Sequence, residues 1–212
     1  MGLPSSGAGA LRRVACDAAG IAAAAGAIAA GGVVAYPTDT VYAIGCSARN
    51  AAAVAAVNAA KSRDASRPMP VLCASEGDAW EVARPCDVAR RLAAAFWPGA
   101  LTMVLPLADP RVGEAMGLRG GTVGVRVPDS ACALSLLREC GPLVGTSANV
   151  SGREPAADAG SISVRGVDIV IDGGPVRDGR GPSTVVAIPE RAAPEVLREG
   201  ALRRADVEAH WT

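Results

Sequence analysis

Histidine and aromatic residues are scarce in this 212-residue sequence. The only histidine, His210, stands beside the end of the chain, which argues against Ser–His–Asp triads, histidine metal centres and a histidine general base. Aromatic residues make up 3% of the chain, whereas half of it is hydrophobic. We therefore expect a core built from valine, leucine, isoleucine and alanine.

The six cysteines include no C-x-x-C pair, the spacing typical of zinc sites and redox motifs. A disulfide framework is typical of small secreted domains, and this chain is longer than those. We expect six free thiols, packed as small hydrophobes in a reducing cytoplasm. The residues concerned are Cys16, Cys46, Cys73, Cys86, Cys132 and Cys140.

The sequence also has no net charge, because 21 basic residues balance 21 acidic ones. The chain therefore has no overall excess of positive charge that would make nucleic acid its main ligand. A local basic patch could still exist, because acidic residues elsewhere would balance it in the net charge. No apolar run is long enough for a membrane span. The Ala-rich stretch after Arg12 and Arg13 contains Asp17 and leads directly into a strand, which favours a helix over a signal peptide. We expect a cytoplasmic protein.

The order of predicted elements indicates a single domain over residues 13–212, after a disordered tail over residues 1–12. Apolar periodicity and caps predict helices over 14–30, 50–61 and 130–140, with one or two more over 76–96. Strands are predicted at 33–36, 68–75, 122–128, 142–146, 167–171, 184–188 and 195–198, and a turn followed by a strand within 97–107. This interleaving predicts an α/β fold of three layers, a twisted, open, mixed sheet with helices on both faces. Ligands are expected where strands end.

Two nucleotide-binding signatures, GxxxxGK[ST] and a GxGxxG that follows a strand, do not occur. Four polar clusters beside predicted strands remain as candidate sites. The first is PTDT at residues 37–40, a composition that also favours an ordinary turn. Tyr36 and Tyr42, the only two tyrosines, bracket it.

The second cluster, KSRDASRP at residues 61–68, contains Lys61, Arg63 and Arg67 with a single acidic residue. Charge runs of this kind are usually solvated, but three cations between buried elements suit phosphate groups. Lys61 and Arg63 fall outside the apolar periodicity, so we expect their replacement to leave the fold intact.

The third cluster is Thr122 with Arg126, on one face of the predicted strand 122–128. An arginine in mid-strand needs an anionic partner or an open cleft. A purely structural alternative is that Arg126 pairs with an acidic side chain, such as Asp129 or Asp172, and braces the sheet.

The fourth cluster, GTSANVSG at residues 145–152, offers hydroxyls and backbone N–H groups to phosphate or carboxylate oxygens. GPSTVV at residues 181–186 repeats this pattern more weakly. Together the four clusters predict a cleft with at least three cations, many hydroxyls and no histidine.

The motifs YPTDTVYAIGC, KSR, VGVRVP, TSANVSG and STVV occur in the order seen in the YrdC-type threonylcarbamoyl-AMP synthase family, which the chain resembles over about residues 18–202. The family's K-x-R and S-x-N elements match Lys61, Arg63, Ser147 and Asn149. The resemblance implies a YrdC-like fold and the condensation of L-threonine, bicarbonate and ATP into threonylcarbamoyl-AMP and pyrophosphate. Other enzymes then transfer the threonylcarbamoyl group to tRNA. Mg²⁺ is expected to accompany ATP, without a dedicated protein metal site, and weak tRNA contact is compatible with this activity.

The resemblance also implies roles for single residues. The positions that match threonine contacts are Thr40, Tyr42, Arg126, Thr146 and Ser183. The positions that match ATP contacts are Arg63, Arg67, Thr122, Ser147 and Arg198. Lys61, Arg63, Ser147 and Asn149 carry the family's catalytic pattern.

The sequence departs from the family pattern at several positions, among them Ala43 for a usual glycine, Ser130 for a frequent histidine, and Pro155 within a replaced P-S-P-T run. Three alternatives therefore remain open: an RNA-binding module, a paralogue of the same fold without this activity, and a carbamoyl transferase related to hydrogenase maturation factors.

Overall fold

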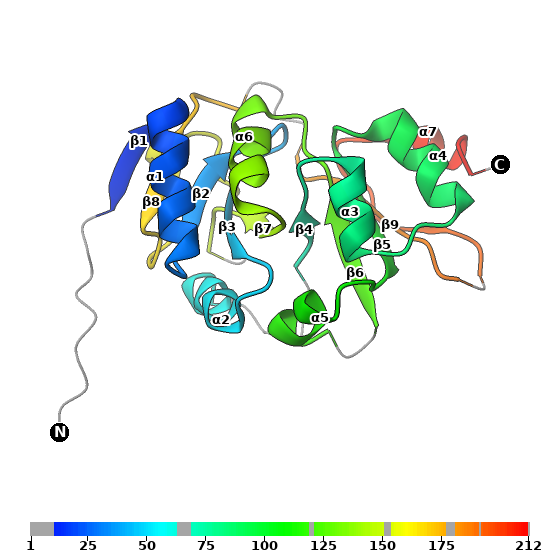
Figure 1. The fold of residues 1–212 in the computed structure, drawn as a ribbon. Helices are drawn as coiled ribbons and strands as arrows, with labels where there is room; N and C mark the ends of the chain where they lie inside the picture. Colours follow the sequence, from blue (N-terminus) through cyan, green and yellow to red (C-terminus); the bar gives the residue numbers. More distant parts are fainter. Residues whose placement is uncertain are drawn as a thin grey trace.

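The computed structural model describes residues 11–62, 69–118, 121–150, 154–176, 181–190 and 192–211. Helices and strands alternate along the chain (Figure 1). The strands are β1 (Arg12–Ala15), β2 (Val34–Pro37), β3 (Tyr42–Ser47), β4 (Val71–Leu72), β5 (Leu101–Pro106), β6 (Thr122–Arg126), β7 (Leu143–Ser147), β8 (Ile169–Asp172), β9 (Thr184–Ala187) and β10 (Glu195–Arg198). The helices are α1 (Ala18–Ala29), α2 (Ala51–Ala60), α3 (Glu76–Val82), α4 (Asp87–Phe96), α5 (Pro110–Met116), α6 (Ala131–Cys140) and α7 (Arg204–Glu208), with a 3₁₀ turn η1 (Ala159–Ser161).

The strands of the described residues form one sheet in the order β1-β8-β2-β3-β7-β4-β6-β5-β9-β10. The sheet contains both parallel pairs (β1 with β8, β2 with β8, β4 with β6, β5 with β9) and antiparallel ones such as β2 with β3 and β5 with β6. The prediction of a mixed α/β sheet is therefore confirmed.

The two faces of this sheet are covered differently. The first face carries Tyr36, Leu72 and Arg126, and its core contains the buried side chains of α1 and α6. These two helices lie side by side over the β8, β2 and β3 part of the sheet (Figure 1).

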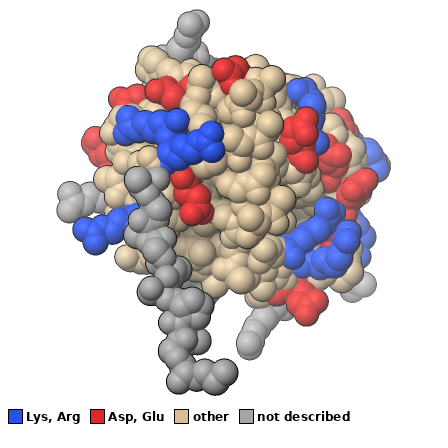
Figure 2. Space-filling model, turned by 60° about the vertical axis from the view of Figure 1, so that its left-hand side comes forward, with Lys and Arg blue, Asp and Glu red and all other residues tan. Residues whose placement is uncertain are grey.

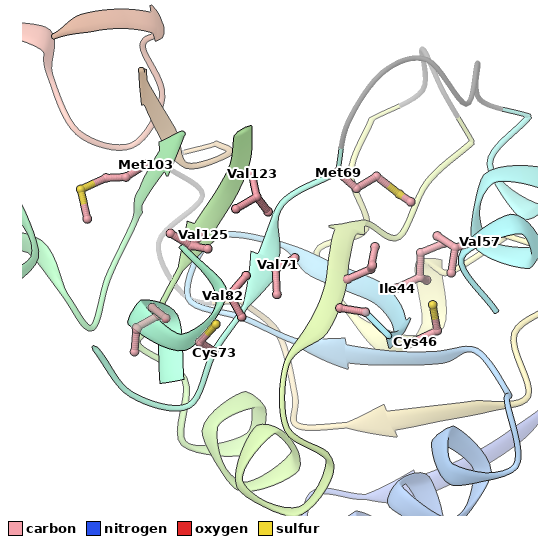
Figure 3. Close-up of a cluster of buried hydrophobic side chains, with 14 of the residues drawn as sticks. Ile44, Cys46, Val57, Met69, Val71, Cys73, Val82, Met103, Val123 and Val125 are labelled. Atoms are coloured by element: carbon pink, nitrogen blue, oxygen red, sulfur yellow. The ribbon is translucent and has the colours of Figure 1, made fainter. Parts of the chain in front are cut away.

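The second face is packed by more helices. The buried side chains of α2, α3, α4, α5 and α7 all belong to its core, which Figure 3 shows around Val71, Val125 and Ile44. Strict alternation along β6 sends Val123 and Val125 into this core and leaves Thr122 and Arg126 on the first face. The first face beyond α6 is thus free to form a cavity.

The start of the chain differs from the sequence-based prediction. β1 occupies Arg12–Ala15, where a helix over 14–30 was expected, and α1 begins only after Asp17, whose side chain accepts a hydrogen bond from the N–H of Gly20. β1 exists because it pairs in parallel with β8, more than 150 residues away, and no local pattern reveals such a partner. Arg12 is thus ordered, whereas the rest of the predicted tail up to residue 10 lies outside the described residues.

The expectation of six free thiols is wrong for two of them. Cys16 and Cys132 form a disulfide between the segment before α1 and the first turn of α6. Cys46 and Cys140 are free, and burial raises the pKa of their thiols to about 12 and about 11. Sequence spacing could not show this pair, because α1 and α6 meet only through the fold.

Figure 2 shows basic side chains in separate groups with acidic neighbours, and a wide uncharged area between them. The face in view therefore offers no continuous basic surface to a polyanion. No described helix combines the length and the apolar character that are needed to cross a bilayer.

Candidate functional site

A cavity of about 350 Å³ opens on the first face of the sheet, beside the end of β2 and between β7 and β10. Most predicted site residues of the described chain line it, namely Thr40, Thr122, Arg126, Thr146, Ser147, Ser183 and Arg198. Arg63 and Arg67 lie outside the described residues. Seven residues from separate motifs thus line one cavity.

Strand register explains this convergence. Thr122 and Arg126 alternate with the buried valines of β6, and Arg126 stands beside Leu72 of β4. β7 continues the same face with Gly145 and Ser147, which pair with β3. The polar residues at the strand ends therefore point into one space.

The PTDT turn after β2 carries a chain of hydroxyl contacts. Thr38 Oγ1 donates to the Val41 carbonyl at 2.6 Å and accepts from the backbone N–H of Thr40 and of Val41. A hydroxyl has one proton, so in the 3.1 Å contact between the two threonine hydroxyls Thr40 is the donor. Thr40 Oγ1 also accepts from Arg126, which leaves it one lone pair at the cavity.

Arg126 is held by three partners. Its Nε donates to the Gly99 carbonyl at 2.9 Å, its Nη1 to Thr40 Oγ1 at 3.1 Å, and its Nη2 to Asp39 Oδ1 at 2.6 Å. Arg126 does pair with an acidic side chain, as the structural alternative expected, but the partner is Asp39 and not Asp129 or Asp172. Burial lowers the pKa of Arg126 from its ordinary value, and the carboxylate of Asp39 opposes this shift.

A second guanidinium, Arg198 of β10, lines the same cavity. Its Nη2 donates to the Ser183 carbonyl at 2.8 Å, and the Ser183 hydroxyl lies 2.8 Å from that of Thr102. Burial and the positive charge of Arg126 both lower the pKa of Arg198. The ion pairs of the described residues do not include Arg198. This wall therefore favours an anion.

Lys61 lies behind the cavity and is not part of its lining. Its side chain donates to the carbonyl of Ser147, to the carbonyl of Asn149 at 2.7 Å and to Asn149 Oδ1 at 3.3 Å. The residue is only 2% exposed. The expectation that its replacement would leave the fold intact does not fit this burial. Lys61 and Asn149 instead secure the loop that carries Ser147 into the cavity.

The two tyrosines lie on opposite faces of the sheet. Tyr42 packs in the second core, where its hydroxyl donates to the Gly174 carbonyl at 2.7 Å and accepts from the Gly173 N–H at 3.2 Å. It lies outside the cavity lining, although the resemblance placed it in the threonine pocket. Tyr36 is fully buried on the first face, and a Cβ at position 45 would come within 3.0 Å of its hydroxyl. That glycine leaves room for the ring.

Sequence reasoning gave no individual role to Thr38 of the PTDT cluster, and it missed Thr102 and Leu197 as lining residues. A polar residue inside the apolar run LTMVL was a signal that could have identified Thr102. Leu197 carried no such signal, because only the β9–β10 hairpin brings it to the cavity.

The fold and site agree with comparisons to known proteins. A relative from Mycobacterium tuberculosis (strain H37Rv) is 43% identical over 188 residues, which cover 85% of this chain and 84% of the relative. The threonylcarbamoyl-AMP synthase of Bacillus subtilis (strain 168) is 34% identical over 197 residues, which cover 89% of this chain and 56% of that protein.

The crystal structure of Pyrococcus abyssi Sua5 complexed with L-threonine superposes with a TM-score of 0.83 at 35% identity. The match covers 94% of this chain but 59% of the Sua5 chain, so this protein spans only part of that relative's length. Residues 26–200 match the model of the Sua5/YciO/YrdC family, which is described as "Telomere recombination". This chain therefore belongs to the Sua5/YciO/YrdC family.

Proposed function

We propose that this protein is a threonylcarbamoyl-AMP synthase, which condenses L-threonine, bicarbonate and ATP into threonylcarbamoyl-AMP and pyrophosphate. The observation that carries this proposal is the presence of two guanidiniums, Arg126 and Arg198, on separate walls of one hydroxyl-rich cavity. Such a cavity suits two substrates that each carry an anionic group and must react with each other.

The Arg126 end of the cavity is the proposed threonine site. Its guanidinium keeps two N–H groups for a carboxylate, and the free lone pair of Thr40 accepts from an amine or a hydroxyl. Thr146 and Ser183 also line the same cavity. These groups match the carboxylate, amine and hydroxyl of L-threonine.

The Arg198 wall is the proposed nucleotide site. Arg198 offers positive charge without a carboxylate partner among the described residues, and Thr122 and Ser147 supply hydroxyls. We also propose that Arg63 and Arg67, which lie outside the described residues, contact the phosphates. Lys61 and Asn149 support this site through the loop after β7.

The proposed reaction needs positioning and charge neutralisation more than a strong base. The neutral amine of threonine adds to CO₂ with loss of a proton, or to bicarbonate with loss of water, to give N-carboxythreonine. The new carboxylate then attacks the α-phosphorus of ATP and displaces pyrophosphate. Arg126 orients the amino acid, and Arg198 offsets charge on the phosphates. Histidine is not required for either task.

Mg²⁺ would reach this site bound to the triphosphate, where it neutralises phosphate charge. The described residues contain no group of three His, Cys, Asp or Glu side chains that could hold a metal ion. Hydroxyls and guanidiniums of the cavity fit a nucleotide that brings its own cation.

The test is release of pyrophosphate from ATP by the purified protein, with each substrate omitted in turn. We expect release that requires both L-threonine and bicarbonate and proceeds without RNA. Turnover only after RNA is added would favour an RNA-binding module, and consumption of carbamoyl phosphate would favour a carbamoyl transferase. We further propose that the product serves tRNA-modifying transferases in the cytoplasm, where ATP and tRNA are available.

A further inference from the structure

The ion pair between Arg126 and Asp39 joins a residue of the cavity lining to one outside it. Arg126 lines the cavity, whereas Asp39 does not, although Thr40 beside it does. The side chains are 7% and 16% exposed, and Nη2 lies 2.6 Å from Oδ1. A carboxylate of the protein therefore already faces the guanidinium to which a substrate would bind.

The remaining donors of Arg126 define where a ligand can bind. A guanidinium has five N–H groups, and three of them donate to Gly99, Thr40 and Asp39. The other two have no partner among the described residues. A ligand carboxylate that accepts from them shares the guanidinium with Asp39, so two negative charges then face one positive charge.

The two cationic ends of the cavity thus differ in charge balance. Asp39 balances Arg126, whereas no described carboxylate pairs with Arg198. An anion that binds at Arg126 places a second negative charge beside the carboxylate of Asp39 in a buried place, which is costly. A zwitterion avoids this cost, because its ammonium group compensates the added charge and can donate to the free lone pair of Thr40.

We infer that Asp39 is a specificity-determining residue, which makes the Arg126 end selective for zwitterionic amino acids over carboxylates that lack an ammonium group. This inference rests on the proposed function, since it assumes that the amino-acid carboxylate binds at Arg126. Asp39 acts through Arg126 and does not itself touch the substrate.

The test compares L-threonine with 3-hydroxybutanoate, which is threonine without its amino group, in wild-type protein and in Asp39→Asn. Asparagine keeps an oxygen that accepts from Nη2 but removes the charge. A unit charge about 6 Å away, at an effective dielectric constant of about 20, changes affinity by up to about a hundredfold. We expect Asp39→Asn to tighten 3-hydroxybutanoate binding about ten- to a hundredfold, and so to reduce the ratio by which threonine is preferred over it. The affinity for ATP should stay unchanged in calorimetric titrations.

Asp129→Asn is the matched control, because Asp129 is exposed, carries the same charge as Asp39 and lies shortly after Arg126 at the end of β6. It should leave the preference unchanged. The inference would be overturned if Asp39→Asn left the preference for threonine over 3-hydroxybutanoate unchanged, or if it weakened the binding of both ligands equally. If Asp39→Asn does not fold, Asp39→Ser, which also retains an oxygen acceptor, takes its place.

Arg126→Gln separates this inference from the proposed function. Threonine binding that survives in Arg126→Gln would overturn both, because the amino acid would then lie elsewhere. If threonine binding depends on Arg126 but the preference for threonine over 3-hydroxybutanoate is the same in wild type and Asp39→Asn, the inference alone is overturned.

Discussion

The Nζ of Lys61 lies 2.7 Å from the carbonyl oxygen of Asn149, which joins the end of α2 to the loop after β7. Lys61 is the only lysine of the sequence; every other basic side chain apart from His210 is arginine. An ammonium has three donors in a compact group, and here they serve acceptors on Ser147 and Asn149. Lys61 therefore binds the backbone carbonyls of Ser147 and Asn149 on the buried side of this loop, and Ser147 also lines the cavity.

Lys61→Met should lower stability and activity together. The substitution keeps an apolar stem but leaves the carbonyls of Ser147 and Asn149 without this donor. A buried acceptor that loses its partner costs about 1–3 kcal/mol, and we expect a fall in activity of about tenfold or more. Urea unfolding and pyrophosphate release measure the two effects. Wild-type stability with lost activity would instead indicate that the ammonium acts directly on substrate.

Arg126→Lys should raise the KM for threonine strongly and that for ATP much less. A lysine ammonium cannot contact Gly99, Thr40, Asp39 and a ligand carboxylate at once. Loss of a charge-assisted hydrogen bond worth about 1.5–3 kcal/mol predicts that the KM for threonine rises roughly ten- to a hundredfold. Steady-state kinetics with each substrate varied separately would decide, and equal changes in both KM values would contradict the assignment.

Arg198→Gln should show the opposite pattern, with a KM for ATP raised about tenfold or more and a smaller effect on threonine. The charge that the Arg198 wall offers to phosphate is removed, while the amide still has a donor for the Ser183 carbonyl. Arg12→Gln, an exposed arginine of β1, serves as a control for the change in net charge. A selective rise in the threonine KM would place the nucleotide elsewhere.

Tyr42→Phe and Tyr36→Phe form a matched pair. The Tyr42 hydroxyl bonds to Gly173 and Gly174, so its loss should cost about 0.5–1.5 kcal/mol with an unchanged KM for threonine. The buried Tyr36 hydroxyl has no hydrogen-bond partner in the described chain, so its removal should be neutral or stabilising. Chemical denaturation of both variants measures the difference. A raised KM for threonine in Tyr42→Phe would instead indicate that the Tyr42 side chain contacts threonine.

The Cys16–Cys132 disulfide should leave four thiols to react with an alkylating reagent under denaturing, non-reducing conditions. Replacing both cysteines with serine should lower the free energy of unfolding by about 2–4 kcal/mol, because the bond closes a long loop. Mass spectrometry of the alkylated protein gives the count. Six modified cysteines would show that the bond does not form.

Local patterns predicted the parts of the fold and site that depend on neighbouring residues. Alternation along 122–128 placed Thr122 and Arg126 on one face, and the structure sends both into the cavity. The partner of Arg126 could not be predicted in this way, because Asp39 lies 87 residues away. β1 could not be predicted for the same reason, because it forms by pairing with β8 far along the chain. The burial of Lys61 could not be predicted either, because its acceptors lie at the distant end of β7 and in the loop that follows.

The strand order also determines when, during synthesis, the cavity can exist. β8 is inserted between β1 and β2, so these early strands gain their shared neighbour only after residue 172 has been made. Ser183 and Arg198 arrive later still, on the segment that adds β9 and β10 beside β5. Contacts between such distant segments form slowly. A nascent chain on the ribosome thus holds Arg126 and Thr40 well before the opposite wall, and a complete cavity forms only once β10 has emerged.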